Sequence, residues 1–365
     1  MKQEGLSFSG RDRIVVEGKE YLYLAGTDYH RMSRSPLIAE AVAAAVKEYG
    51  LGSTGSRVTT GNHRLYQELE AALSGFFTTE SALVLPSGYL SNTCLLEGMA
   101  EDFDLFLIDE KAHSSLFDAL KGIHKRIVRF PFCDPGGFEA QLRKHLRGGE
   151  RPLLLTDGVF PARGELAPLE DYARILLPYD GRMLVDDAHA MAILGKTGKG
   201  SWEESGIDRS LVFQTGTLSK GFGCFGGLVC GSLEQVERIK KRSRAYSGST
   251  GLPLPLLVAG ISSLAYLSAH QELISGLRAR TRTLKKRFLG LGFDLPDNPV
   301  PIFSITFYDE RKNHHLASRL LEHGIYPSFV HYPGAPAGGH FRFVLSSQTS
   351  EEQVELLFSG IASLV

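Results

Sequence analysis

Cysteine is scarce in this sequence, and the few cysteines are not arranged as a disulfide or metal framework. There are four in 365 residues, and no two of them form a CxxC pair. Cys94 and Cys133 stand alone, only Cys224 and Cys230 lie near one another, and no histidine accompanies them at the spacing of a zinc ribbon. We therefore expect neither structural disulfides nor a bound metal.

The sequence also lacks a long hydrophobic run and an excess of charge of either sign. Its longest apolar stretch, around 252–259, is interrupted by Pro253 and Pro255, and the N-terminal segment MKQEGLSFSGRDR has no apolar core. These features predict neither a signal peptide nor a spanning helix, so a cytoplasmic location is expected. With 40 Lys and Arg against 41 Asp and Glu, there is no broad basic field to bind nucleic acid or a membrane surface.

What is present is the composition of an ordinary globular protein. Apolar residues make up 43% and charged residues 22%, which argues against disorder and fibrous structure. The length of 365 residues suggests two domains, at roughly 150 residues for each domain. Glycine is common, at 40 residues, and several glycines stand in loops that follow predicted strands.

Between about residues 81 and 231, short apolar runs alternate with stretches of helical spacing. Each run is bounded by Gly, Pro or Asp, which is typical of buried strands in a parallel sheet. The runs are SALVLPS, DLFLID, KRIVRF, PLLLTDG, RMLVDDAH, SLVFQTG and GGLVCGS, and helical spacing recurs over 88–100, 114–122, 137–147 and 168–178. The pattern predicts an α/β domain with a mostly parallel seven-stranded sheet and helical crossovers.

The character of the chain changes after residue 232. A charged helix is expected over 233–245, followed by a long helical tract over about 254–289. The strands PIFSITF and HFRFVLSS and the helices 313–323 and 350–364 then predict a small α+β domain. We divide the chain into an N-terminal segment (1–45), a large domain (46–250) and a C-terminal small domain (251–365).

One glycine motif can be set aside on physical grounds. Gly221-Phe-Gly223-Cys-Phe-Gly226 has the GxGxxG spacing of a dinucleotide-binding loop. Such a loop follows a strand and opens a helix, whereas a predicted strand, GGLVCGS, comes directly after this motif. Dinucleotide binding is therefore not expected here.

Lys220 is the first candidate for chemistry. It stands in Thr-Leu-Ser-Lys-Gly-Phe-Gly, after a predicted strand and among small and hydroxyl-bearing residues. Such surroundings suit a solvated surface charge poorly, and desolvation favours loss of the ammonium proton, which a lysine needs in order to form a Schiff base. Taken alone, Lys220 could equally be an ordinary loop lysine.

Asp186 is the second candidate, at the end of the predicted strand RMLVDDAH. Burying its carboxylate is unfavourable unless a cation or hydrogen-bond donors compensate, and the protonated ring nitrogen of a pyridine cofactor would be such a cation. Asp187 is expected on the opposite face, because side chains alternate along a strand. A metal cluster with His189, or a helix cap, is the alternative reading.

Polar residues at other strand ends complete the candidate site. Ser87-Gly88-Tyr89 opens a predicted helix, and the free N–H groups at a helix N-terminus can bind phosphate, with Thr217 and Ser219 adding hydroxyl donors. His113 follows the strand DLFLID, and its ring could stack on a flat cofactor. A plain helix cap explains Ser87 equally well, and a loop histidine is more often structural.

Together and in this order, these residues resemble the α-oxoamine synthases, a family of fold-type I enzymes that use pyridoxal 5'-phosphate (PLP). The similarity runs from about Tyr21 to the C-terminus. The segments that carry it are Gly50–Arg57, Gly61–Glu70, Ser87–Asn92, Asp109–His113, Thr156–Phe160, Asp186–His189, Thr217–Gly223 and Pro333–Phe343. The resemblance implies a fold-type I PLP transferase that acts as a homodimer with shared active sites.

The resemblance also implies a role for the matched residues. The implied catalytic residues are Lys220, which would carry PLP as a Schiff base, Asp186 at the ring nitrogen, His113 on the ring and His189 at the phenolic oxygen. The implied cofactor-binding set is Ser87, Gly88, Tyr89, His113, Asp157, Asp186, His189, Thr217, Ser219, Lys220, Ser249 and Thr250, of which the last two would reach the phosphate of the neighbouring subunit. Arg342 would bind the carboxylate of an amino-acid substrate.

By the same resemblance, the expected reaction is decarboxylative condensation of a small amino acid with an acyl thioester. The first expectation is L-alanine with pimeloyl-CoA or a pimeloyl carrier protein, giving 8-amino-7-oxononanoate. A glycine- or serine-using synthase, an aminotransferase and a PLP-binding protein without turnover are the alternatives. The chain departs from the family pattern at Thr27, Asp157, Pro161 and Arg163, where Asn, Glu and a Ser-Met-Asp-Gly segment are usual, and these departures bear chiefly on substrate contacts.

Overall fold

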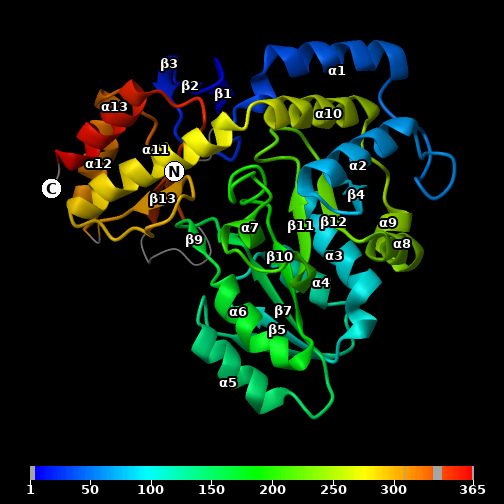
Figure 1. The fold of residues 1–365 in the computed structure, drawn as a ribbon. Helices are drawn as coiled ribbons and strands as arrows, with labels where there is room; N and C mark the ends of the chain where they lie inside the picture. Colours follow the sequence, from blue (N-terminus) through cyan, green and yellow to red (C-terminus); the bar gives the residue numbers. More distant parts are fainter. Residues whose placement is uncertain (1–4, 308, 332–338, 364–365) are drawn as a thin grey trace.

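The computed structural model describes residues 5–307, 309–331 and 339–363 (Figure 1). At its centre lies a seven-stranded sheet with the strand order β4-β12-β11-β10-β7-β5-β6. The strands are β4 (Ser81–Leu85), β5 (Leu105–Asp109), β6 (Arg126–Phe130), β7 (Pro152–Asp157), β10 (Arg182–Asp186), β11 (Val212–Thr217) and β12 (Gly227–Gly231). Only β12 runs antiparallel to its neighbours, so the expected mostly parallel sheet is confirmed.

The strands form where they do because both faces of the sheet are covered. Leu153 and Leu155 of β7 pack on one face, in a core that includes Leu95 and Val236, whereas Leu154 packs on the other. The covering helices are α2 (Arg64–Phe77), α3 (Gly88–Met99), α4 (Ser114–Leu120), α5 (Pro135–His145), α6 (Leu169–Leu176) and α8 (Leu233–Arg242). A strand buried on both sides reads as a continuous apolar run, which is why the sequence revealed the inner strands, whereas the edge strand β6 is exposed at Ile127 and was found by its RIVRF pattern.

The N-terminal part holds a sheet that the sequence did not predict. Its strands are β1 (Ser7–Phe8), β2 (Arg13–Val16) and β3 (Lys19–Leu22), and Leu22 exchanges backbone hydrogen bonds with Gly324 and Tyr326 of the C-terminal part. Helix α1 (Pro36–Tyr49) lies beside α10 (Leu254–Ala269), as Figure 1 shows. Helix α1 thus runs across residue 45, and the domain limits at residues 45 and 250 stay predictions.

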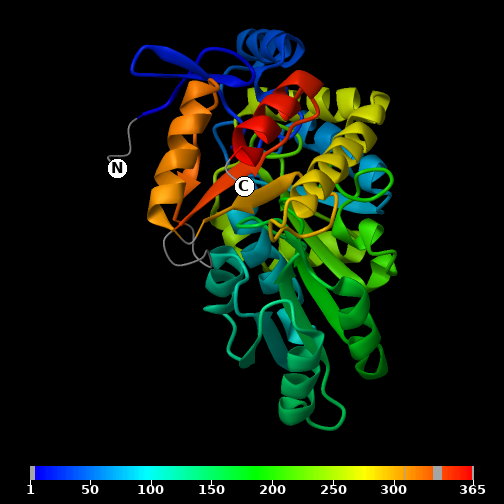
Figure 2. The same ribbon diagram turned by 90° about the vertical axis from the view of Figure 1, so that its left-hand side faces the viewer.

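The C-terminal part forms a second, smaller sheet with helices packed against it (Figure 2). Its strands are β13 (Ile302–Ile305), β14 (Phe329–Val330) and β15 (His340–Val344), in the order β13-β15-β14. The helices are α11 (Glu272–Gly290), α12 (Glu310–Glu322) and α13 (Glu351–Ala362). The long helical tract is two helices, because the chain turns at His270 and Gln271 between α10 and α11.

The remaining elements are short. They are β8 (Val159–Phe160), β9 (Glu165–Leu166), α7 (Ser201–Glu204), α9 (Arg244–Gly248) and the 3₁₀ turns η1 (Met32–Arg34), η2 (Ala100–Asp102), η3 (Leu177–Tyr179) and η4 (Arg209–Leu211). The GxGxxG segment forms the loop between β11 and β12 and opens no helix. Among the described residues, none of the helices combines the length and apolarity needed to cross a membrane.

Candidate active site

The candidate residues come together at one edge of the large sheet. Strands β7 and β10 end side by side at Asp157 and Asp186, and β11 ends nearby at Thr217. The parallel strands present their carboxyl ends at this edge, where ligands of open α/β sheets bind. Lys220 follows β11 by three residues, and helix α3 begins at the same edge after β4.

The side chains of Lys220 and His189 face each other at this edge of the large sheet. The distance from Lys220 Nζ to His189 Nε2 is 2.8 Å, and the His189 side chain is buried. Burial lowers the pKa of the Lys220 ammonium, although the nearby Asp186 and Asp157 act in the opposite direction. Burial, together with the Lys220 charge, holds the pKa of His189 well below its ordinary value, so the imidazole is neutral.

Asp186 is held by hydrogen-bond donors. Asn92 Nδ2 donates to Asp186 Oδ2 at 2.7 Å, and the backbone N–H of Ala188 donates to Oδ1 at 3.0 Å. Asn92 is itself fixed, because Thr215 donates to its amide oxygen at 2.6 Å. These contacts orient a buried carboxylate toward the strand edge and leave further lone pairs on both oxygens for a cationic partner.

Asp187 points to different partners. Its carboxylate accepts hydrogen bonds from the hydroxyl and N–H of Ser201 and from Gln214 Nε2 at 2.7 Å. The side chain is fully buried, and burial raises its pKa to about 6. Neighbouring aspartates therefore have separate surroundings, as alternation along a strand requires.

His113 and Asp157 lie next to Asp186. The backbone N–H of His113 donates to Asp157 Oδ2 at 2.7 Å, and His113 Nδ1 lies 2.8 Å from Ser115 Oγ. Burial raises the pKa of Asp157 well above its ordinary value, and the neighbouring Asp186 adds to this effect. Burial lowers the pKa of His113. A flat, uncharged imidazole and an acid whose ionised form is disfavoured by burial thus border the site.

The N-terminus of α3 forms a tight cradle against the end of β11. Ser87 caps the helix, accepting a hydrogen bond from Leu90 N, and Thr217 Oγ1 lies 3.0 Å from Ser219 Oγ. A Cβ atom on Gly88 would lie 2.8 Å from Thr217 Cβ, so only glycine allows this approach. Tyr89 is largely exposed, and its hydroxyl donates to Asp118. Hydroxyls and free N–H groups gathered here suit a phosphate.

Arg342 reaches the same region from the small sheet. It lies in β15, and its Nε–H donates to the carbonyl oxygen of Pro161 at 2.8 Å. Its charge acts on both Lys220 and His189, which places the guanidinium near the reactive amine. Pro161 belongs to the turn that departs from the family pattern, and in that turn Arg163 pairs with Asp294 at 2.8 Å. The segment 332–338, which helped to carry the resemblance, lies outside the described residues.

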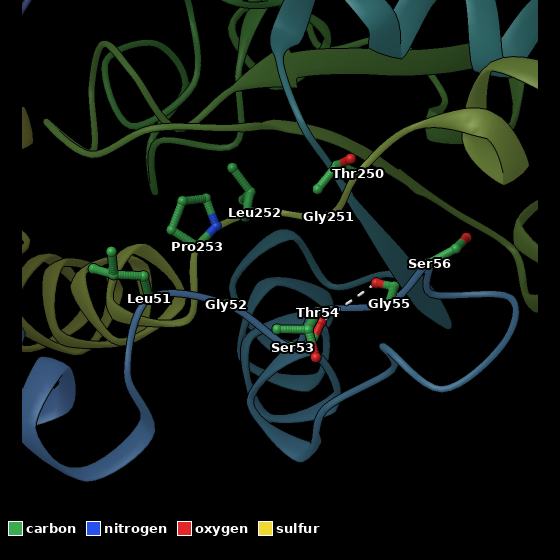
Figure 3. A pocket seen from close by; sticks show the side chains of 10 residues that line it. All are labelled: Leu51, Gly52, Ser53, Thr54, Gly55, Ser56, Thr250, Gly251, Leu252 and Pro253. Atoms are coloured by element: carbon green, nitrogen blue, oxygen red, sulfur yellow. Dashed lines mark hydrogen bonds between the residues drawn. The ribbon is translucent and has the colours of Figure 1, made fainter.

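Ser249 and Thr250 lie outside the cluster formed by Lys220, Asp186 and His189. Thr250 lines a hollow of about 520 Å³ between the segments 51–56 and 250–253, shown in Figure 3, where Ser53 Oγ donates to the Gly55 carbonyl at 3.5 Å. Ser249 Oγ donates to Ala245 O at 2.5 Å. The residues that line the hollow do not include Lys220, Asp186 or His189. Within one chain, Thr250 therefore faces a different opening from Lys220.

Sequence reasoning missed two side chains of the site. Asn92 stands one helical turn after Gly88 and so projects from the same side of α3, a signal that the sequence offered. Tyr29, whose hydroxyl lies 2.7 Å from His189 Nδ1, comes from the segment between β3 and η1 and offered no signal of its own. Both act through contacts that span more than 90 residues of sequence.

The donor set fits PLP. Asp186 offers a carboxylate to a ring nitrogen, Lys220 offers a desolvated amine to an aldehyde, and the Gly88 cradle would be filled by any added Cβ. A dianionic phosphate would find the α3 N-terminus and the Thr217 and Ser219 hydroxyls beside it.

Comparison with known proteins agrees with this reading. The family model for aminotransferase class I and II matches residues 19–361. An 8-amino-7-oxononanoate synthase of Geobacter sulfurreducens is 33% identical over 96% of this chain and 90% of its own length. Another, from Symbiobacterium thermophilum, is 30% identical over 97% of this chain and 91% of its own. The structure of Sphingomonas wittichii serine palmitoyltransferase superposes with a TM-score of 0.90 at 27% identity, covering 98% of this chain and 90% of that one.

These matches extend over nearly the whole chain and include both the large and the small sheet and the candidate site residues. They confirm the expected fold, the expected enzyme class and PLP as the cofactor. The chain belongs to the class I and II aminotransferase family and, within it, to the α-oxoamine synthases, PLP-dependent enzymes of fold type I.

Proposed function

We propose that this protein condenses L-alanine with a pimeloyl thioester, releasing carbon dioxide and a free thiol and giving 8-amino-7-oxononanoate. The observation that carries the proposal is the buried pair of Lys220 and His189, 2.8 Å apart beside Asp186. The choice of alanine and pimeloyl groups is supported by relatives that carry the name 8-amino-7-oxononanoate synthase.

Each side chain has a task in this reaction. Lys220 supplies a buried amine whose deprotonation burial favours; it would hold the cofactor aldehyde and act as the general base for the proton on the substrate carbon. When bound, PLP supplies an electron sink that stabilises negative charge on that carbon. Asp186 would keep the ring nitrogen protonated, His189 would donate to the phenolic oxygen, and Arg342 would hold the amino-acid carboxylate with its planar fork.

Phosphate and ring contacts complete the proposal. We assign the phosphate to Ser87, Gly88, Tyr89, Thr217 and Ser219. We assign His113 to stack on one face of the ring, with Asp157 behind it. The cradle at Gly88 and the position of His113 at the start of α4 support these assignments.

A panel of substrates tests the reaction. Purified protein is mixed with alanine, glycine or serine and with acyl-CoAs of different length, and free thiol and carbon dioxide are measured. Alanine with pimeloyl-CoA should give the fastest release of thiol. Production of an α-keto acid without thiol would identify an aminotransferase, and no product from any pair would leave only PLP binding.

The attachment site is tested separately by borohydride reduction. The label should be found on Lys220 and should be lost in Lys220→Ala. Lys285 is the control, since it is also buried and its pKa is lowered to about 7 by burial. A label on Lys285 would show that low basicity alone selects the lysine and would overturn the assignment.

A serine-using synthase is the second candidate. The serine palmitoyltransferase structure, at a TM-score of 0.90, supports it. In the panel, this enzyme would release thiol with serine and a long-chain acyl-CoA, and not with alanine.

We also propose a homodimer with shared active sites, located in the cytoplasm. Large apolar side chains are exposed along α1 and the segment that follows it, as expected of a surface covered by a second subunit: Leu37, Val46, Leu51 and Val58. The Thr250 hollow adjoins this surface, because Leu51 also lines it, and Lys220 is not among its lining residues. In the dimer, Ser249 and Thr250 would meet the phosphate held by the other subunit.

A further inference from the structure

Tyr29 is a fully buried phenol in the candidate active site. Its hydroxyl oxygen lies 2.7 Å from His189 Nδ1, and the two rings meet edge to face with centroids 6.3 Å apart. On its other side, His189 Nε2 lies 2.8 Å from Lys220 Nζ. Tyr29, His189 and Lys220 therefore form one continuous chain of polar contacts.

The direction of the proton in the Tyr29 contact follows from the neighbouring groups. A neutral imidazole carries one ring proton, on Nδ1 or on Nε2. Burial raises the pKa of Tyr29 far above its ordinary value, so the phenol keeps its proton, although the charge of Arg342 acts to lower it. Arg342 can only donate hydrogen bonds, so it offers no acceptor for the phenol proton.

The phenol has a single proton to place. If His189 Nδ1 also donated to Tyr29, that proton would have no partner in a fully buried site, at a cost of about 1–3 kcal/mol. If Tyr29 donates to Nδ1, each polar group finds a partner once Lys220 is in the neutral form that burial favours: Nδ1 accepts, Nε2 bears the ring proton, and Nε2–H points to the lone pair of the Lys220 amine. The second arrangement is favoured.

We infer that Tyr29 is a positioning residue that holds His189 in its Nε2–H tautomer. The opposite tautomer would turn an Nε2 lone pair toward Lys220. For the bound cofactor, the inference rests on the proposed function: Nε2–H is the form that can donate to a phenolic oxygen, whereas a lone pair would repel it.

The test is ¹⁵N NMR of the full-length protein labelled at histidine, with and without PLP, with His189→Gln to identify the resonances. In wild type, we expect Nε2 protonated and Nδ1 unprotonated but hydrogen-bonded. In Tyr29→Phe, the Nδ1 resonance should shift to that of an unbonded nitrogen, and the Nδ1–H form should become detectable. Tyr66→Phe, which removes another buried hydroxyl that donates to Leu252 O at 3.0 Å, should leave His189 unchanged.

The outcomes separate clearly. A wild-type His189 protonated at Nδ1 would overturn the inference, and this result needs no variant to fold. A Tyr29→Phe spectrum identical to that of wild type would overturn it as well. In kinetics, Tyr29→Phe should lower kcat and alter the pH dependence of the PLP absorption band, whereas Tyr66→Phe should change neither. A protein that releases no thiol would refute the proposed reaction and leave the tautomer result standing.

Discussion

At the scale of single residues, Asp186 and Asp187 have different partners, so replacing them should have different effects. Asp186→Asn keeps the shape of the side chain but removes the charge that would stabilise a protonated ring nitrogen. We expect PLP to bind and turnover to fall on the order of a hundredfold or more, as when other charge-stabilising groups are removed. The measurement is thiol release together with the amount of bound PLP.

Asp187→Asn is the matched comparison, because its side chain contacts Ser201 and Gln214. Its turnover should stay near that of wild type. Equal losses in the two variants would show that the separation of the two carboxylates does not matter for the chemistry.

Asp187 should also make stability depend on pH. Its pKa is about 6 in the folded protein, against roughly 3.9 in an unfolded chain, so folding favours the protonated form. The stabilisation from protonation is complete below about pH 4 and is lost as the pH rises through about 6, and the full effect is roughly 3 kcal/mol. Relative to Asp187→Asn, the cofactor-free wild type should lose free energy of unfolding across this range.

Urea denaturation at intervals between pH 4 and 8 measures this difference. The variant removes one titrating group from both states, so the contributions of Asp109 and Asp157 cancel in the comparison. If the difference in free energy of unfolding between wild type and Asp187→Asn does not change with pH, the raised pKa of Asp187 is refuted.

Arg342 should affect the amino acid and not the cofactor. Its Nε–H is committed to Pro161 O, which fixes the plane of the guanidinium and leaves the terminal nitrogens for a carboxylate. Lysine cannot reproduce this geometry, so Arg342→Lys should raise the KM for the amino acid about tenfold or more, on the order of 1.4 kcal/mol. The KM for the thioester and the PLP spectrum should change little.

Arg163→Lys provides the control, because Arg163 lies in the same turn but pairs with Asp294. It should leave the amino-acid KM near its wild-type value. If Arg342→Lys behaved like Arg163→Lys, Arg342 could not be the carboxylate ligand.

At the scale of elements, the close approach of α3 to β11 should control cofactor affinity. In Gly88→Ala, the new Cβ would lie 2.8 Å from Thr217 Cβ, so the helix N-terminus must move away from the strand. We expect the dissociation constant for PLP to rise about tenfold or more, since 1.4 kcal/mol of lost contact is enough. Spectroscopic titration of the cofactor-free protein measures it.

Gly75→Ala in α2 is the matched substitution, because nothing lies within 4 Å of the added Cβ. It should leave PLP affinity unchanged and stabilise the protein by about 0.5–1 kcal/mol, since alanine is the better helix former. Unchanged PLP binding in Gly88→Ala would mean that the phosphate sits elsewhere.

The large sheet could be predicted from sequence because its strands carry their own signal. A run such as PLLLTD is buried on both faces, so apolar residues and the bounding aspartate mark the strand. The short strands β1 to β3 carry no such run, since β1 is exposed and β3 has one buried residue. The turn at His270 was hidden for a different reason: the helices on either side of it have continuous helical spacing.

At the scale of the whole molecule, the site contacts that escaped prediction are those between distant segments. Asp186 ends a strand, and Lys220 and His113 each follow one, so the topology alone brings them to one edge. Tyr29 reaches His189 only because the N-terminal segment pairs with the C-terminal part through Leu22 and then returns to the sheet edge. Such a contact has no periodicity and no local motif, and it depends on how the two sheets pack.

The proposed dimer can be tested by mixing two defective subunits. Lys220→Ala removes the amine, and Thr250→Asp sets a negative charge where a phosphate of the other subunit is expected, so each homodimer should lack most activity. In a mixed dimer with shared sites, one site combines the intact Lys220 of one subunit with the intact Thr250 of its partner. The other site carries both defects.

The mixed dimer should therefore regain up to about half of the wild-type activity per dimer, since one of its two sites is complete. The two variants carry different affinity tags, so mixed dimers can be purified after unfolding and refolding together, and thiol release is then measured. If Thr250 served the site of its own subunit, each site of the mixed dimer would contain one defect. No activity would return, and the assignment of Ser249 and Thr250 to the neighbouring site would be wrong, even if the protein were dimeric by sedimentation.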